Sequence, residues 1–209
     1  APLVGVHIPD GAVVYNMEPL YDGCRSFSLG YMDTLKRCRV LDYSRPNVDY
    51  LKRHGVDAFY LPYGYHQSLE RTPAREKRFD FLLVGSVNPR RAQMVNELRR
   101  FFEVLWVTGA YGNALDELVA MSRVCLNIHF IPDHPLEVAR LNYLMANHCT
   151  VVTEPGNDEV LNSAYAPGVH MGVDIVAACA EALSRPRDGY ECIRSIPMDL
   201  TGAKDWLTR

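Results

Sequence analysis

The stretch HPLEVARLNYLMANHCTVVTE, residues 134–154, places three polar side chains at three-residue intervals along a helical pattern. With Pro135 in the first helical turn, Glu137 suits the positive end of the helix dipole and pairs with Arg140 at i+3. That describes a well-formed helix which needs no ligand. In a nucleotide site, however, Glu137 would accept hydrogen bonds from ribose hydroxyls, and Arg140 would meet a phosphate or simply hold Glu137. Tyr143 follows one interval further along.

A second group of polar residues follows an apolar run, in the segment VGSVNPRRAQ. Gly85 lets the backbone turn tightly or approach a ligand closely, and Ser86 or Asn88 can cap the next helix. The free N–H groups of a helix start favour a phosphate, and Arg90 and Arg91 add charge there. The alternative is an ordinary turn with both arginines in water. Neither a P-loop nor a dinucleotide glycine fingerprint is present.

Two further strand ends carry candidate binding residues. In TGAYGNAL, Gly109 and Gly112 flank Tyr111, whose ring could stack on a nucleobase. The alternative is a two-glycine turn before a helix capped by Asn113. In VCLNIHF, Asn127 and His129 alternate, so both point to one side of a strand and need partners.

A structural histidine is the alternative to a catalytic one at position 129. His129 and His134 make no convincing metal pair, and no D-x-D or H-E-x-x-H motif appears. We therefore expect no metal in this protein.

The elements that must position these residues are clearest in the second half. The continuous apolar run at 79–86, FDFLLVGS, predicts a strand buried on both faces. Further strands are expected at EVLWVTG, VCLNIHF, CTVVTE and GVHMGV, with helices at PRRAQMVNELRRFF, NALDELVAMSR, PLEVARLNYLMAN, DEVLNSA and IVAACAEALS. This alternation predicts an α/β fold whose parallel sheet has helices on both faces. Ligands of such sheets bind beyond the carboxyl ends of the strands.

The first half predicts a smaller α/β unit. Strands are expected at PLVGVHI, AVVYNM, CRVLDYS and AFYLPYG, and a helix at NVDYLKRHG, ended by Gly55. The charged segment 68–80 has no periodicity and predicts a linker. We therefore expect a small unit at 1–70, a Rossmann-like unit at 71–185 and a helical tail at 186–209.

Composition limits the classes of function. The net charge of −3 over 209 residues provides no overall positive potential that would attract nucleic acid. The sequence contains no apolar stretch of 18 residues, so we expect no membrane span. No cysteine pair has metal-ligand spacing, which favours reduced thiols and a cytoplasmic protein. The chain begins APLVG without methionine, which suggests a piece of something longer. The six cysteines are Cys24, Cys38, Cys125, Cys149, Cys179 and Cys192.

The order of these motifs resembles a known family. The segments VLDYSRPNVDYLKRHGV, YLPYGYHQSL, DFLLVGSVNPRR, GAYGNALDELVAMSRVCLNIHF and LEVARLNYLMANHCTVVTE together resemble bacterial and phage glycosyltransferase-like proteins. These have a GT-B fold and are of the group 1, sugar-nucleotide-dependent type. The resemblance implies two Rossmann-like units: a C-terminal one that binds a nucleotide-sugar donor, and an N-terminal one that presents the acceptor.

The chain departs from the family pattern in two respects. Many group 1 enzymes carry a Glu-x7-Glu pattern around the donor. Here Glu137 is present, but Phe130 stands seven residues before it and Met145 eight after it, and Tyr143 occupies the place where the resemblance implies the second glutamate. The first unit is also short for the fold. Either the acceptor half is minimal, or part of it lies on a missing segment or another chain.

The resemblance implies metal-independent transfer of a sugar to an acceptor hydroxyl, with the nucleotide sugar as substrate and no other cofactor. Arg90, Arg91 and Arg140 would stabilise the leaving nucleoside diphosphate. An inverting enzyme also needs a base. Glu18, after the strand VVYN, is the first candidate for this base, with His66 and Asp42 behind it. A retaining mechanism would not need the same base.

Neither the donor sugar nor the acceptor follows from the sequence, and the acceptor could be a glycan, a small molecule or a modified nucleobase. The main rival is a non-catalytic module that holds a sugar nucleotide or a protein partner. A nicotinamide-dependent oxidoreductase is disfavoured because the dinucleotide fingerprint is missing.

Overall fold

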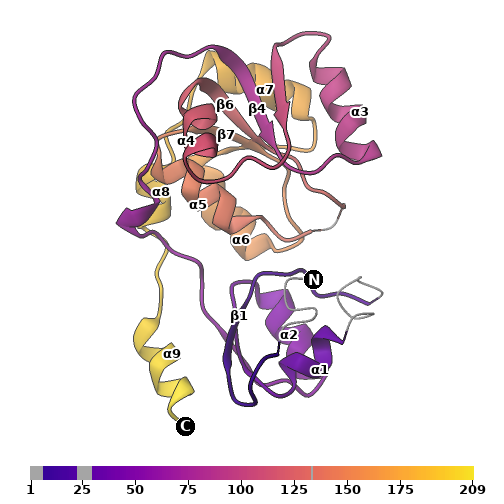
Figure 1. The fold of residues 1–209 in the computed structure, drawn as a ribbon, viewed down its shortest axis with the longest axis vertical. Coiled ribbons are helices and arrows are strands. Elements are labelled where there is room, and N and C mark those ends of the chain that lie inside the picture. Colours follow the sequence, from indigo (N-terminus) through magenta and orange to yellow (C-terminus); the bar gives the residue numbers. More distant parts are fainter. Residues whose placement is uncertain (1–6, 23–29, 133) are drawn as a thin grey trace. The chain divides into compact units, whose positions relative to one another are not determined.

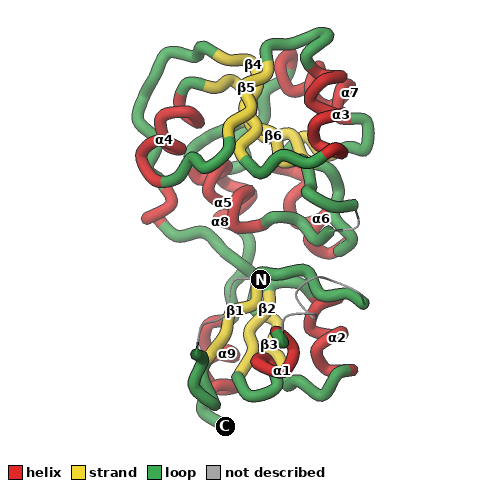
Figure 2. Tube along the Cα trace, turned by 45° about the vertical axis from the view of Figure 1, so that its right-hand side comes forward, coloured by secondary structure: helices red, strands yellow, loops and turns green. Residues whose placement is uncertain are grey.

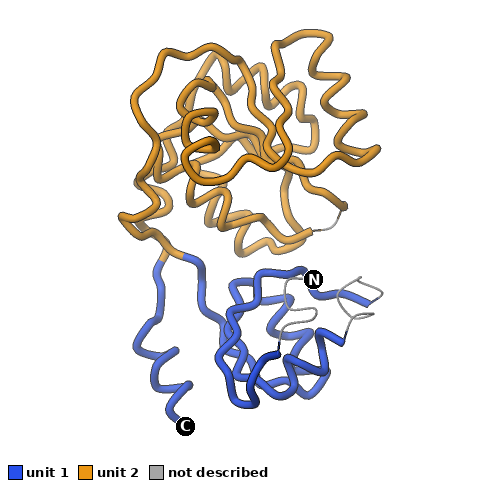
Figure 3. Tube along the Cα trace, in the orientation of Figure 1, with its two compact units in different colours: residues 1–63, 197–209 blue, residues 64–196 orange. Residues whose placement is uncertain are grey.

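A computed structural model describes residues 7–22, 30–132 and 134–209. Its contacts divide the chain into two compact units, Ala1–Tyr63 with Pro197–Arg209, and Gly64–Ile196 (Figure 3). The C-terminal helix thus groups with the N-terminal segment. Within the described ranges, no helix combines the length and apolar character needed to cross a bilayer.

The larger unit contains a parallel sheet of order β5-β4-β6-β7-β8. Its strands are β4 (Phe79–Val84), β5 (Val104–Val107), β6 (Ser122–Asn127), β7 (Thr150–Thr153) and β8 (His170–Met171). The chain moves from β4 to β5 on one side and then returns to add β6 on the other side. This reversal makes the β4–β6 boundary a topological switch point, where ligands of open α/β sheets bind.

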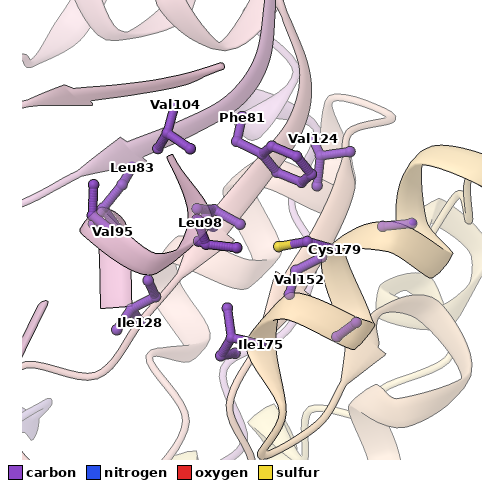
Figure 4. Packing of buried hydrophobic residues seen from close by; sticks show 13 residues of the cluster. Phe81, Leu83, Val95, Leu98, Val104, Val124, Ile128, Val152, Ile175 and Cys179 are labelled. Atoms are coloured by element: carbon purple, nitrogen blue, oxygen red, sulfur yellow. The ribbon is translucent and has the colours of Figure 1, made fainter. Parts of the chain in front are cut away.

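One face of this sheet packs against α3 (Pro89–Leu98) and α7 (Ile175–Ser184). Figure 4 shows this core, in which strand residues such as Phe81 and Val124 meet Leu98 and Cys179 from the two helices. The strands are apolar on both faces because helices cover both, as the sequence predicted.

The opposite face of the sheet carries α4 (Gly112–Ala120) and α5 (Val138–Ala146) (Figure 1). Right-handed crossovers on either side of the switch point place α3 and α4 on opposite faces. The remaining elements of this unit are η2 (Gln67–Leu69), α6 (Glu159–Tyr165), η3 (Ala166–Gly168) and α8 (Tyr190–Arg194).

The smaller unit is built on the parallel sheet β1-β2-β3, visible in Figure 2. Its elements are β1 (Val13–Asn16), α1 (Tyr31–Leu35), β2 (Arg39–Asp42), α2 (Arg45–Arg53), β3 (Ala58–Tyr60) and α9 (Leu200–Leu207). Alternate strand residues face different helices. Val40 and Ala58 pack with α1 and α2, whereas Leu41 and Phe59 pack with α9.

The predicted α/β class with parallel sheets flanked by helices is confirmed, and several local expectations need correction. His7 and Ile8 are not in a strand, and the rest of that predicted strand lies outside the described residues. The predicted helix PLEVARLNYLMAN begins only at Val138, so Pro135 precedes it and Glu137 occupies the N-cap. The helix α4 is capped by Tyr111 rather than Asn113, which is already helical.

Candidate functional site

Gly85 directly follows β4 at the switch point and is closely surrounded. Its N–H donates to the carbonyl of Val107 at 2.9 Å, and its own carbonyl accepts from the indole of Trp106 at 3.0 Å. Its φ is +154°, and a Cβ built on it would lie 2.7 Å from an Arg91 guanidinium nitrogen. A glycine is favoured here because L side chains rarely adopt this φ, and a Cβ would also displace the buried guanidinium.

Arg91 in α3 is almost completely buried, with 3% of its surface exposed. Its Nε donates to the carbonyl of Ile128 at 2.9 Å, and its Nη1 donates to the carbonyl of Ser86 at 3.2 Å. Burial lowers its pKa, while the Glu137 carboxylate opposes the shift. The idea that this arginine extends into water is therefore wrong. The guanidinium is part of the wall at the switch point.

Glu137 joins two arginines from different elements. Its Oε1 lies 3.5 Å from Arg91, and its Oε2 lies 3.0 Å from Arg140, so the predicted i,i+3 pair is present. With Gly85, Ser86 and others, these three side chains line a hollow of about 350 Å³. Two guanidinium groups against one carboxylate leave a surplus positive charge. The hollow is therefore suited to an anion.

The N-terminus of α3 contributes less to this charge than expected. Pro89 has no N–H, and the side chain of Asn88 accepts the N–H of Arg91 at 2.7 Å. The Asn88 amide also donates to the carbonyl of Phe130. Guanidinium groups therefore supply the positive charge that we expected in part from free helix N–H groups.

Arg90 points to a different partner, Glu154. Its guanidinium forms a two-pronged ion pair with that carboxylate and donates to the carbonyl of His129 at 2.8 Å. The same carboxylate accepts the backbone N–H of His129 at 2.8 Å. Sequence reasoning did not select Glu154, although it directly follows β7, where the strand-end rule applies.

His129 is buried with 2% of its surface exposed, and neither ring nitrogen has a hydrogen-bond partner among the described residues. Its ring stacks against His134, with centroids 5.7 Å apart. Burial lowers its pKa, and Glu137 and Glu154 act in the opposite sense. A neutral imidazole is therefore favoured.

Asn127, also buried, donates to the Thr153 hydroxyl at 3.0 Å. Its amide oxygen accepts from Arg140 at 3.3 Å. This strand-end residue thus orients an arginine of the cationic hollow.

A second hollow, of about 310 Å³, has a mainly apolar wall between the sheet and the α4–α5 layer. Val84, Ala110, Tyr111 and Arg140 line both hollows. The remaining residues of the apolar one are Arg71, Leu82, Leu115, Val119, Cys125, Leu126, Ala139, Tyr143 and Leu144.

Tyr143 therefore does not lie at the cationic hollow. Its hydroxyl donates to Asp116 at 2.6 Å, and Arg71 donates to the same carboxylate oxygen at 3.2 Å. Burial raises the pKa of Tyr143, and its bond to Asp116 adds to the shift. Neither Asp116 nor Arg71 was singled out from the sequence, because one lies inside a helix and the other in the predicted linker.

Tyr111 is 81% exposed at the N-cap of α4, at the rim of both hollows. Gly109 and Gly112 have φ of +72° and +54°, so each needs the backbone freedom of glycine. Among the predicted binding residues, those that line the cationic hollow are Gly85, Ser86, Arg91, Gly109, Tyr111, Glu137 and Arg140.

The three candidates for a base have different environments. Asp42 is fully buried and accepts hydrogen bonds from Asn16 and from the N–H of Ser44, so it is not available to a substrate. Glu18 is half-buried after β1, and its backbone is held by Asn16. His66 belongs to the other unit and uses Nδ1 to cap η2.

The described residues contain no group of three or more His, Cys, Asp or Glu that could hold a metal ion. The cysteines in the described ranges are free thiols. Cys24 lies outside those ranges.

No family model matches the chain. An alignment of 119 residues, which covers 50% of this chain, is 27% identical to an uncharacterized protein, L137, of Acanthamoeba polyphaga mimivirus. That segment amounts to 16% of the mimivirus protein.

Solved structures resemble the chain more extensively. A UDP-forming α,α-trehalose-phosphate synthase from Burkholderia xenovorans matches 95% of this chain with a TM-score of 0.60 and 10% identity, over 68% of its own length. The chain has a GT-B-like glycosyltransferase fold.

Two further GT-B structures agree with that assignment. AviGT4, a glycosyltransferase of avilamycin A biosynthesis, matches 81% of this chain with a TM-score of 0.53 and 14% identity, over 61% of its own length. Sucrose-phosphate synthase from Thermosynechococcus elongatus matches 83% with a TM-score of 0.50 and 15% identity, over 56% of its length. The chain is thus considerably shorter than either, and the likeness concerns the fold.

Proposed function

We propose that this protein is a glycosyltransferase that moves a sugar from a nucleotide-sugar donor to an acceptor hydroxyl. The observation that carries the proposal is the cationic hollow at the switch point, where Arg91 and Arg140 share the carboxylate of Glu137. When the sugar–phosphate bond breaks, negative charge develops on the departing diphosphate. Preorganised guanidinium groups stabilise that charge.

The adjoining apolar hollow supports the same assignment. A nucleoside diphosphate has a charged end and an aromatic base, and the two hollows, which share four lining residues, offer a cationic wall and an apolar wall. In this arrangement Arg140 and Arg91 would bind phosphate, Glu137 would accept from ribose hydroxyls, and Tyr111 would stack on the base. Glu18 is the proposed base for the acceptor hydroxyl.

A non-catalytic module is the second candidate, and one observation favours it. Tyr143 stands on α5 where many group 1 enzymes carry a second glutamate, and its hydroxyl is committed to Asp116. The same two hollows would then bind a sugar nucleotide without transfer.

The first test is calorimetry with a panel of nucleoside diphosphates and with inorganic pyrophosphate. Arg140→Ala should weaken binding of both kinds of ligand by about 10- to 100-fold, since hydrogen bonds to charged groups contribute roughly 1.5–3 kcal/mol. The matched control is Arg123→Ala, because that arginine is exposed and pairs with Asp80 on the surface.

Each outcome separates the candidates. Failure of every diphosphate to bind would remove the donor site altogether. The enzyme is supported if the protein binds a nucleotide sugar and slowly hydrolyses it to nucleoside diphosphate and free sugar. Arg140→Ala should lose this hydrolysis. Binding of intact sugar nucleotides without turnover, across a panel of acceptors, supports the module.

A further inference from the structure

The apolar hollow has few polar groups with which to distinguish one ligand from another. Four of its lining residues, Arg71, Tyr111, Arg140 and Tyr143, carry polar side chains that could do so. Tyr111 lies at the rim, 81% exposed, where its ring is proposed to stack on the base. Arg140 is engaged by Glu137 and Asn127, and the Tyr143 hydroxyl donates to Asp116. A tyrosine hydroxyl has one donor and a guanidinium has five, so Arg71, whose guanidinium donates to Asp116, keeps the most donors for a ligand.

Arg71 belongs to the segment that connects the two units, and hydrogen bonds attach this segment to α5, which lines the apolar hollow. The backbone N–H groups of Arg71 and Thr72 both donate to the side-chain oxygen of Asn147, each at 2.8 Å. The amide of Asn147 in turn donates to the carbonyls of Leu69 and Tyr143, each at 2.7 Å. The linker is thereby fixed to the C-terminal end of α5.

The guanidinium of Arg71 is also held in place. It donates to Asp116 at 3.2 Å and lies over the ring of Tyr143, 4.9 Å from its centroid. Asp116 is 5% exposed, so the pair is anchored in the wall on the carboxylate side. A guanidinium has five N–H donors and no acceptor. The contacts with Asp116 and Tyr143 leave donors for a ligand.

We infer that Arg71 selects the nucleobase of the donor. This inference rests on the proposed function. The site would prefer nucleotides with a carbonyl at position 4 of a pyrimidine or position 6 of a purine, where cytosine and adenine carry an amino group. A carbonyl oxygen accepts from a guanidinium, whereas an amino group presents hydrogens to it. Uridine, thymidine, guanosine and inosine diphosphates belong to the accepted class.

Two ligand pairs isolate this single difference. UDP and CDP differ at position 4 of the pyrimidine, and IDP and ADP differ at position 6 of the purine. In calorimetry the native protein should bind the carbonyl member of at least one pair at least about tenfold more tightly than the amino member. This is the discrimination that one good hydrogen-bonded base contact provides. Which pair responds shows whether a pyrimidine or a purine fits.

Arg71→Gln should remove this preference, since an amide carries both a donor and an acceptor. Its affinity for inorganic pyrophosphate should stay within about twofold of the native value, because the cationic hollow is unchanged. The matched control is Arg75→Gln. That arginine lies in the same segment but pairs on the surface with Glu117 at 2.6 and 2.7 Å, so its variant should keep the preference.

The inference and the proposed function fail in different ways. If all four nucleotides bind equally, if the amino members bind more tightly, or if Arg71→Gln keeps the native preference, Arg71 does not read the base. The cationic donor site would still stand. If neither pyrophosphate nor any nucleotide binds, the proposed function itself is overturned.

Discussion

At the scale of single residues, the site depends on Glu137, whose two carboxylate oxygens pair with two different arginines. One oxygen faces the buried Arg91 and the other faces Arg140. Removing one member of a buried charged group leaves the others uncompensated, which costs more than the net value of the pair. The carboxylate therefore stabilises the two arginines by itself, and it would compete with a bound phosphate for them.

Glu137→Gln separates these two effects. We expect the free energy of unfolding to fall by about 1–3 kcal/mol because two guanidinium groups lose their counter-charge. Pyrophosphate should bind more tightly than to the native protein, since the local positive charge rises. The advantage of a nucleoside diphosphate over pyrophosphate should shrink if Glu137 accepts from ribose.

Urea unfolding and calorimetry measure the two quantities. A uniform loss of affinity for pyrophosphate and nucleotide, in step with the loss of stability, would show that Glu137 only maintains the fold. Glu117→Gln is a suitable control, because Glu117 pairs with Arg75 on the surface of the same unit.

His129 makes stability depend on pH. Burial lowers its pKa in the folded protein, whereas an unfolded histidine has a pKa of about 6.5. Below that value the unfolded state binds more protons, so stability falls as the pH drops from 6.5 toward the folded pKa and is unaffected above it. For one group the slope reaches at most about 1.4 kcal/mol per pH unit.

His129→Phe should flatten the pH dependence of the free energy of unfolding, by at most one proton, measured by urea unfolding at several pH values between 7.5 and 5. His170, which is also buried with a lowered pKa, contributes a second proton and provides the comparison. An unchanged slope in His129→Phe would mean that this imidazole binds protons equally in the folded and unfolded states, with Glu137 and Glu154 balancing the effect of burial.

At the scale of elements, the strand–helix alternation was predictable because its signal is local. The run FDFLLVGS is apolar enough to predict β4, and Asn88 and Pro89 mark the start of α3. The start of α5 was misplaced because Pro135 is compatible with a first helical turn. In the structure the chain around Leu136 is instead packed against Gly156, where an added Cβ would lie 2.7 Å from the Leu136 nitrogen.

Contacts between distant segments were beyond such reasoning. The ion pair between Arg90 and Glu154 joins residues 64 positions apart. The hydrogen bond from the Arg71 N–H to the Asn147 side chain joins residues 76 positions apart. Neither pair has a local pattern. The strand-end rule nevertheless selected Gly85, because that rule needs only the end of each predicted strand. The observed strand order then places Gly85 at the switch point.

At the scale of the whole molecule, both hollows of the proposed donor site belong to the larger unit. The cationic and apolar hollows lie entirely within residues 64–196. The smaller unit is completed by the end of the chain. Arg39 at the start of β2 donates to the carbonyls of Trp206 and Leu207 at the C-terminal end of α9. Folding of this unit therefore depends on a helix that follows the larger unit in sequence.

Trp206→Ala tests this division. The indole packs on Phe59 with ring centroids 5.8 Å apart, so its removal should destabilise the smaller unit by about 2 kcal/mol, less than for a fully buried tryptophan. Hydrogen exchange should accelerate in β2 and β3 but not in β4 or β6.

The affinity for nucleoside diphosphates should stay at its native value in Trp206→Ala, because every residue of the two hollows lies in the other unit. Leu200→Ala is the control, since Leu200 is 61% exposed on the same helix and its variant should leave exchange unchanged. A parallel loss of nucleotide affinity, or faster exchange spreading into β4 and β6, would show that the donor site depends on the smaller unit. In that case the two units would fold and bind as one cooperative body rather than as separable parts.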